Sequence, residues 1–142
     1  MNLKVRILFT LLVFALVAAR ASDKGNLVFT DTIHDFGDIT VTGGAVTCQF
    51  EFVNASDSTI HILGALVSCN CTTVDYPRCG IEPGQGGVVR VTYDPVGRPV
   101  GPFNRTVLLQ VSGDRRRLLL RFYGNALAPE LPLERPDFMG RQ

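Results

Sequence analysis

Three of the four cysteines in this chain lie within the segment VSCNCTTVDYPRCG, residues 67–80, at Cys69, Cys71 and Cys79. The fourth is Cys48. Thiols can form disulfides, bind soft metals or exchange with other thiols, and four cysteines allow three pairings. On an extended strand the Cα atoms of Cys69 and Cys71 would be about 6.6–6.8 Å apart, at the upper limit for a disulfide. A bridge between them would therefore need a bent backbone and would be easily reduced.

We predict two structural disulfides, Cys48–Cys69 across the core and Cys71–Cys79 as a local clip, and expect mild reductant to open the clip first. Two other uses of Cys69 and Cys71 remain open. They could bind copper or zinc, although the C-x-C spacing departs from the C-x₂₋₄-C pattern of structural zinc sites, or they could form a redox-active pair. No resident cofactor is predicted.

Catalytic candidates are few. His34 and His61 are the two histidines that could act as a general base near neutral pH. Neither occurs in a pattern that supplies a nucleophile and an orienting group. The glycine-rich run 84–87 precedes a predicted strand rather than a helix, so it does not match a phosphate-binding loop. The sequence therefore predicts a protein that is not an enzyme.

The N-terminus predicts export. Lys4 and Arg6 precede the apolar run 7–19, and Ala19 and Ala21 occupy the small-residue positions of a signal-peptidase site. We predict a signal peptide at residues 1–21 and a periplasmic or secreted protein with no transmembrane helix after cleavage, because the run is shorter than the roughly 20 residues that span a bilayer. In that oxidising location paired cysteines are the default.

The charge balance of the exported chain excludes one class of partner. Removing the three basic residues of the signal peptide from the 14 in the chain leaves 11, against 13 acidic residues and hence a net charge of −2. A protein that binds nucleic acid needs a basic face to neutralise phosphates. No nucleic-acid partner is predicted.

The elements that must position the cysteines are strands. Apolar and polar residues alternate with a period of two in segments 48–52, 88–93, 106–111 and 118–123, with turn signals between them. This pattern predicts an all-β antiparallel sandwich of about seven strands over residues 22–128, followed by an irregular tail at 129–142.

The alternation also predicts the core. In segment 60–69 the apolar residues change parity at Gly64, and a β-bulge there would put all five on the core side: Ile60, Ile62, Ala65, Val67 and Cys69. We expect Gln49, Arg90 and Gln110 to be exposed. The residues expected to be buried are Phe50, Phe52, Ile62, Val67, Val91, Val107, Leu109 and Leu120.

An ordered set of short motifs resembles a known family. These are HDFGDI at 34–39, FEFVN at 50–54, SCNCT at 68–72, IEPG at 81–84, VTYDP at 91–95, GPFNRT at 101–106 and FYG at 122–124. Their order and spacing, over about residues 27–126, resemble the exported bacterial family called domain of unknown function 1573. The resemblance implies an Ig-like sandwich related to PapD-like and flagellar-associated domains, from a Gram-negative bacterium. Asn70 stands where the family has glycine, and Cys48 and Cys79 are additions to its usual cysteine pair.

The sequence thus predicts an exported, non-enzymatic binding or structural module. Domains of the PapD-like kind can bind a partner that adds a strand at an exposed sheet edge. We therefore expect a protein partner in the cell envelope. The alternative is a protein that handles thiols or soft metals through Cys69 and Cys71.

Overall fold

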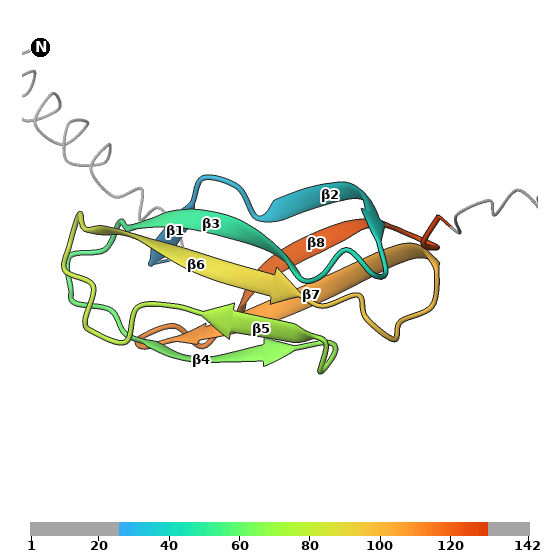
Figure 1. Ribbon diagram of the computed structural model, residues 1–142. Coiled ribbons are helices and arrows are strands. Elements are labelled where there is room, and N and C mark those ends of the chain that lie inside the picture. Colours follow the sequence, from blue (N-terminus) through green and yellow to red (C-terminus); the bar gives the residue numbers. More distant parts are fainter. Residues whose placement is uncertain (1–25, 131–142) are drawn as a thin grey trace, which may run out of the picture.

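Residues 26–130 are described by a computed structural model. They form eight strands and no helix, arranged as two facing sheets (Figure 1). Sheet A has the order β1-β3-β6-β5 and sheet B the order β2-β8-β7-β4. The strands are β1 (Leu27–Phe29), β2 (Ile33–Thr40), β3 (Val46–Asn54), β4 (Ile62–Val67), β5 (Thr72–Asp75), β6 (Gly86–Tyr93), β7 (Gly101–Val111) and β8 (Leu118–Leu127). The predicted all-β Ig-like sandwich is confirmed, with eight strands rather than about seven.

One strand pair departs from the predicted antiparallel arrangement. All hydrogen-bonded neighbours are antiparallel except β2 and β8, which are parallel. Residues 30–32 carry the chain from β1, at the edge of sheet A, to β2, at the edge of sheet B. The chain therefore contributes an edge strand to each sheet at the same margin of the sandwich.

The core lies between the sheets and follows the predicted alternation. Gln49, Arg90 and Gln110 are exposed as predicted. Seven of the eight residues predicted to be buried are buried; the exception is Val67. Burying this apolar surface is the main favourable contribution to folding, since each fully buried aliphatic or aromatic side chain contributes about 1.5–3 kcal/mol.

Strand β4 contains the predicted bulge. Ile62 pairs with Val111 and Gly64 pairs with Gln110, so Leu63 is an extra residue relative to β7. The bulge allows Ile62 and Ala65 both to pack on the core side despite their odd spacing. Val67 has the same parity as Ala65 but is 39% exposed, which corrects its predicted burial. Val67 is exposed because β4 is an edge strand and no further strand covers its outer side.

Two sequence predictions lie outside the described residues. The signal peptide, residues 1–21, falls there entirely, and so does the tail apart from Pro129 and Glu130, which follow β8 without regular structure. Within residues 26–130 no helix is long and apolar enough to span a membrane.

Candidate functional site

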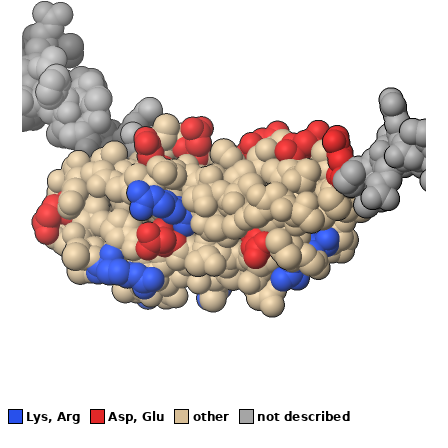
Figure 2. Space-filling model, in the orientation of Figure 1, with Lys and Arg blue, Asp and Glu red and all other residues tan. Residues whose placement is uncertain are grey.

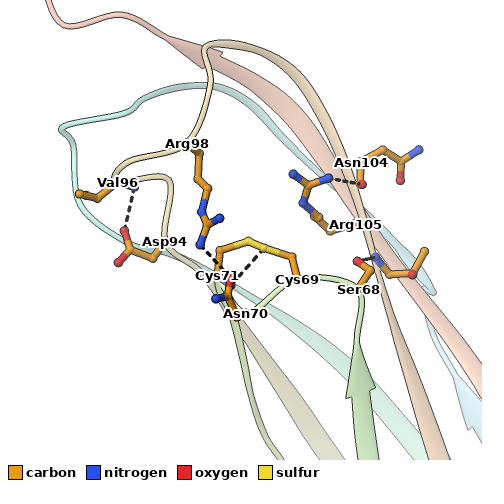
Figure 3. The surroundings of a disulfide bond; sticks show 10 residues. Ser68, Cys69, Asn70, Cys71, Asp94, Val96, Arg98, Asn104 and Arg105 are labelled. Carbon is orange, nitrogen blue, oxygen red and sulfur yellow. Dashed lines mark hydrogen bonds between the residues drawn. A yellow bond between two sulfur atoms is a disulfide. The ribbon is translucent and has the colours of Figure 1, made fainter.

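The cysteine-rich segment forms the turn between β4 of sheet B and β5 of sheet A. There the structure joins Cys69 to Cys71 in a disulfide with a Cα–Cα distance of 5.2 Å (Figure 3). The Thr72 N–H donates to the Cys69 carbonyl at 3.2 Å, which closes the turn. The backbone is thus bent, and the two Cα atoms are closer than on a strand. A bridge at this spacing was predicted to need such a bend.

This bridge differs from the predicted pairing, and Cys48 is a free thiol. Cys48 lies on β3 opposite Val91 of β6, with its side chain in the core. Cys69 lies at the margin where β4 and β5 meet, two strand positions from β3 in sheet order. Two strand spacings are about 10 Å, whereas disulfide-bonded Cα atoms are at most about 6.8 Å apart. The predicted Cys48–Cys69 bridge is therefore not formed.

Cys79 is also a free thiol, and it is exposed. Strand β5 carries the chain away from Cys71, and Ile81 then pairs with Ile60, just before β4 begins. Cys71 follows the other end of β4. A six-residue strand is about 20 Å long, so the predicted Cys71–Cys79 clip would have to span most of that length. The loop with Pro77 does not close on itself.

Burial makes the Cys48 thiol a poor nucleophile. It raises the pKa of Cys48 from 9.0 to about 11, and a backbone hydrogen bond opposes this shift only in part. A neutral buried thiol behaves as a small apolar side chain. Cys48 is therefore a core residue, not part of a reactive cluster.

This raised pKa gives a testable dependence of stability on pH. Between pH 9 and 11 the unfolded chain loses the Cys48 proton while the folded chain keeps it, so the free energy of unfolding should fall as pH rises through this range. The loss is of order 2 kcal/mol. Urea unfolding at pH 8–11 should show a steeper decline for the native sequence than for Cys48→Ala. Parallel declines would contradict the assignment.

Two arginines flank the Cys69–Cys71 bridge (Figure 3). Arg98 donates from Nη2 to the Asn70 Oδ1 at 2.9 Å, which holds its guanidinium over the turn. Arg105 lies on β7, one residue before Thr106, whose N–H donates to the Ser68 Oγ at 3.0 Å. The Nε–H groups of both arginines are buried and have no hydrogen-bond partner. The bridge is therefore flanked by two cations with unused donors, while the Asp94 carboxylate also lies near it and accepts from the Val96 N–H.

A groove opens beside the bridge, along the seam between β4 and β5. The groove has a volume of about 320 Å³ and is lined by Ala65, Val67, Thr72, Thr73, Val74, Tyr76 and Arg78. No ladder hydrogen bonds join β4 to β5, because they belong to different sheets. The Thr72 side chain is 7% exposed, and its Oγ1 has no hydrogen-bond partner. Arg78 stacks on Tyr76, with its Cζ 4.1 Å from the ring centre, at the end of the groove.

The four edge strands differ in how they are protected against pairing with another chain. Strands β1 and β5 have three and four residues, and β2 carries Asp35 and Asp38 around a register shift. Short length, charge and irregularity all protect sheet edges. Strand β4, ILGALV, has six residues, no charge and a bulge only at its beginning. It is the least protected edge among the described strands.

The remaining candidate residues are not brought to this site. His61 precedes β4, whereas Cys69 follows it, and His34 packs edge-on against Phe36 at 4.6 Å on β2. Within the part of the chain that the structure describes, no three His, Cys, Asp or Glu side chains cluster in a way that could hold a metal ion.

Sequence reasoning missed Arg98, Arg105 and the groove. Arg105 has the same parity as Val107 and Phe103, which are buried, so the alternation itself indicated an inward-facing arginine. A role for Arg105 can be inferred only from the structure, which places this residue beside the Cys69–Cys71 bridge. The groove had no sequence signal, because Val67 has the pattern of an ordinary core residue.

The two facing four-stranded sheets, with a chain that contributes an edge strand to each, define this protein as an Ig-like β-sandwich. The family model described as "Protein of unknown function (DUF1573)" matches residues 27–126. The chain belongs to this family, as its motifs predicted. The search of curated proteins found no match.

Solved structures show the same fold at low sequence identity. A protein of unknown function from Porphyromonas gingivalis has a TM-score of 0.59 and 14% identity, over 71% of this chain and 46% of that one. The PapD-like domain 7 of human CEP192 has a TM-score of 0.57 and 11% identity, over 74% and 87% of the two chains. The VesB protease of Vibrio cholerae has a TM-score of 0.54 and 16% identity, over 71% and 32%.

These likenesses concern one domain. The chain spans less than half of the P. gingivalis protein and about a third of the protease. At identities this low they establish the fold and carry no activity to this chain.

Proposed function

We propose that this protein is an exported, non-enzymatic binding module that takes up an extended segment of a partner protein along β4. The observation that carries the proposal is that β4 is an uncharged edge strand with three of its six residues exposed, Leu63, Leu66 and Val67. Long apolar edges left open are sites of pairing with other chains. A partner strand that pairs with β4 would extend sheet B and cover this edge.

The groove fits the inward-facing side chains of such a strand. Val67 and Val74 offer an apolar surface from opposite walls, and the unpartnered Thr72 Oγ1 offers one hydrogen bond. A volume of about 320 Å³ lies at the lower end of the range for ligand sites, about 300–1,000 Å³, and suits side chains rather than a large cofactor. Arg78 at the end of the groove favours an acidic residue in the partner.

The outer faces of the two sheets support the choice of sheet B. On sheet A the cross-strand rows are polar, Thr47–Thr92–Thr73 and Gln49–Arg90–Asp75. On sheet B, Leu66 of β4 lies beside Leu108, and Leu108 beside Leu119. An added strand would thus meet leucine on its outward side as well.

Charge favours the same margin. Figure 2 shows acidic side chains along the margin formed by β2, and basic side chains, with some acidic ones among them, towards the margin formed by β4 and β5. The basic residues there include Arg78, which lines the groove, and Arg98 and Arg105, which flank the turn between β4 and β5. An acidic extended segment would be attracted to this margin and repelled from the other.

Export is part of the proposal. It is supported by the signal-peptide pattern of residues 1–21 and by a bridged cysteine pair, which persists in oxidising compartments. The partner is then a protein of the cell envelope or the surroundings of the cell.

The test selects partner segments and maps where they bind. Random eight-residue peptides displayed on phage are selected on the purified protein, and the selected peptides are titrated into isotope-labelled protein for NMR. We expect alternating apolar residues with an acidic position, and shifts concentrated in the amides of β4 and β5. Val67→Lys should weaken binding at least tenfold, because a charge in an edge strand opposes pairing.

Val28→Lys is the matched control. Val28 is the same residue type, 43% exposed, on edge strand β1 at the other margin. It should leave peptide binding unchanged. Equal loss in both variants, or amide shifts confined to sheet A, would contradict β4 as the binding edge.

A further inference from the structure

The Cys69–Cys71 bridge has the features of a reactive disulfide rather than of a structural clip. It joins residues separated by two positions, so it restrains almost none of the chain. A disulfide that stabilises a fold closes a longer loop, because the stabilisation grows with the number of residues enclosed. Within the described residues the ladders of both sheets are complete without it. Its place in the fold is thus not explained by stability.

The two bridged residues are unequal in access. Cys71 is buried and Cys69 is partly exposed. A thiolate that attacks the bridge therefore reaches the Cys69 Sγ, and the Cys71 Sγ is the leaving group. Access to one sulfur gives exchange a defined direction.

The surroundings can stabilise the thiolates that exchange produces. The buried Nε–H groups of Arg98 and Arg105 lack partners in the bridged state. Two cations with unused Nε–H donors are suited to stabilise an anion that forms beside them, because hydrogen bonds to a charged partner are the stronger ones. The Cys71 N–H, 3.0 Å from the Cys69 Sγ, is a further donor for a thiolate on that atom. The nearby Asp94 carboxylate is engaged with the Val96 N–H at 3.0 Å.

We propose that Cys69 and Cys71 form a redox-active pair that exchanges with protein dithiols, with Arg98 and Arg105 stabilising the released thiolate. The partner thiolate attacks the Cys69 Sγ; a mixed disulfide forms, the Cys69–Cys71 bond breaks, and its electron pair leaves on Cys71. The second partner thiolate then attacks its own sulfur in the mixed disulfide and releases Cys69. The partner is oxidised to a disulfide, the pair gains two electrons, and the two partner protons pass to solvent or to the new thiols.

The first experiment places the full-length protein in graded ratios of reduced to oxidised glutathione, quenches it with an alkylating reagent and quantifies the peptide with Cys69 and Cys71 by mass spectrometry. Circular dichroism follows the fold. We expect Cys69 and Cys71 to be labelled together. The glutathione ratio at which half of the molecules are labelled should be one at which circular dichroism still shows an intact sandwich. A bridge that opens only as the fold melts, or a purified protein with a different pairing, would overturn the proposal.

The second experiment isolates the arginines. The rate of bridge reduction by dithiothreitol should fall about two- to fivefold in Arg98→Gln and in Arg105→Gln, the range for a screened charge interaction at a part-exposed site. Arg98→Lys and Arg105→Lys, which keep the charge, should recover most of the rate. Arg117→Gln, in the exposed turn before β8 at the other end of the sandwich, should react like the native protein. Glutamine variants that react at the native rate would show that the arginines do not stabilise the thiolate.

This exchange does not rest on strand addition at β4. A protein that fails to select peptides but opens its bridge reversibly would retain the redox pair and lose the proposed function. A protein that still binds peptides but whose bridge does not react would lose the redox pair and retain the proposed function.

Discussion

Replacing Phe52 with alanine is expected to lower the free energy of unfolding by about 3–5 kcal/mol. Phe52 is 2% exposed and lies on the inner face of sheet A, where its ring packs 5.4 Å from that of Phe29. Gly87 of the neighbouring strand faces the ring; a Cβ at this position would overlap it, so the glycine leaves the space that the ring fills. Truncation would leave a cavity lined by strands that hydrogen bonds hold in place.

Urea unfolding of the purified protein measures this loss. Val53→Ala is the matched control, because Val53 is the next residue on β3 but faces outward and is 46% exposed. It should cost less than about 1 kcal/mol, as surface substitutions do. Similar losses for both variants would mean that the two faces of β3 are assigned to the wrong sides.

Much of the fold could be predicted because alternation with a period of two has a single physical meaning. Side chains at positions 48, 50 and 52 must lie on one face of a strand, and only one face of each sheet can be buried. The bulge at Gly64 was predictable for the same reason, since Ile62 and Ala65 could not otherwise share the core. The family motifs then identified the sandwich as Ig-like, whereas the parallel pairing of β2 with β8 was not predicted.

The cysteine pairing could not be predicted because it depends on where strands lie in the sheets. Cys48 and Cys69 both carry a core-facing pattern, but sheet order separates their strands. Alternation states which face a residue occupies and says nothing about how far from the margin its strand lies. The same limit explains Val67, which faces inward at a margin that no other strand covers.

One strand links the two proposed activities. Strand β4 ends at Val67, and the bridge begins two residues later, at Cys69. A partner segment paired with β4 would therefore bring its following residues to the disulfide. Binding and exchange could then act on the same partner, with the groove selecting the segment and the bridge reacting with its thiols.

The beginning of β4 depends on a buried polar residue, Asn54, at the end of β3. Its Nδ2 donates to the carbonyls of Ser58 and Ile81, each at 2.8 Å. Its Oδ1 accepts from the N–H and the Oγ–H of Ser56, at 2.9 and 2.7 Å. One side chain thus fixes the loop that leads into β4 and ties it to Ile81, which itself pairs with Ile60.

Asn54→Ala is expected to lower the free energy of unfolding by about 2–4 kcal/mol, because it removes all four hydrogen bonds of this side chain, one of them buried, and leaves the Ser56 N–H without a partner. Ser56→Ala is the matched control: it removes one hydroxyl from the same network and should cost about 0.5–1.5 kcal/mol. Urea unfolding gives both values, and amide hydrogen exchange should show faster opening of residues 55–62 in Asn54→Ala than in Ser56→Ala. If Asn54→Ala costs no more than Ser56→Ala, then the loop is held by the Ile60–Ile81 pairing alone, and the asparagine does not position the binding edge.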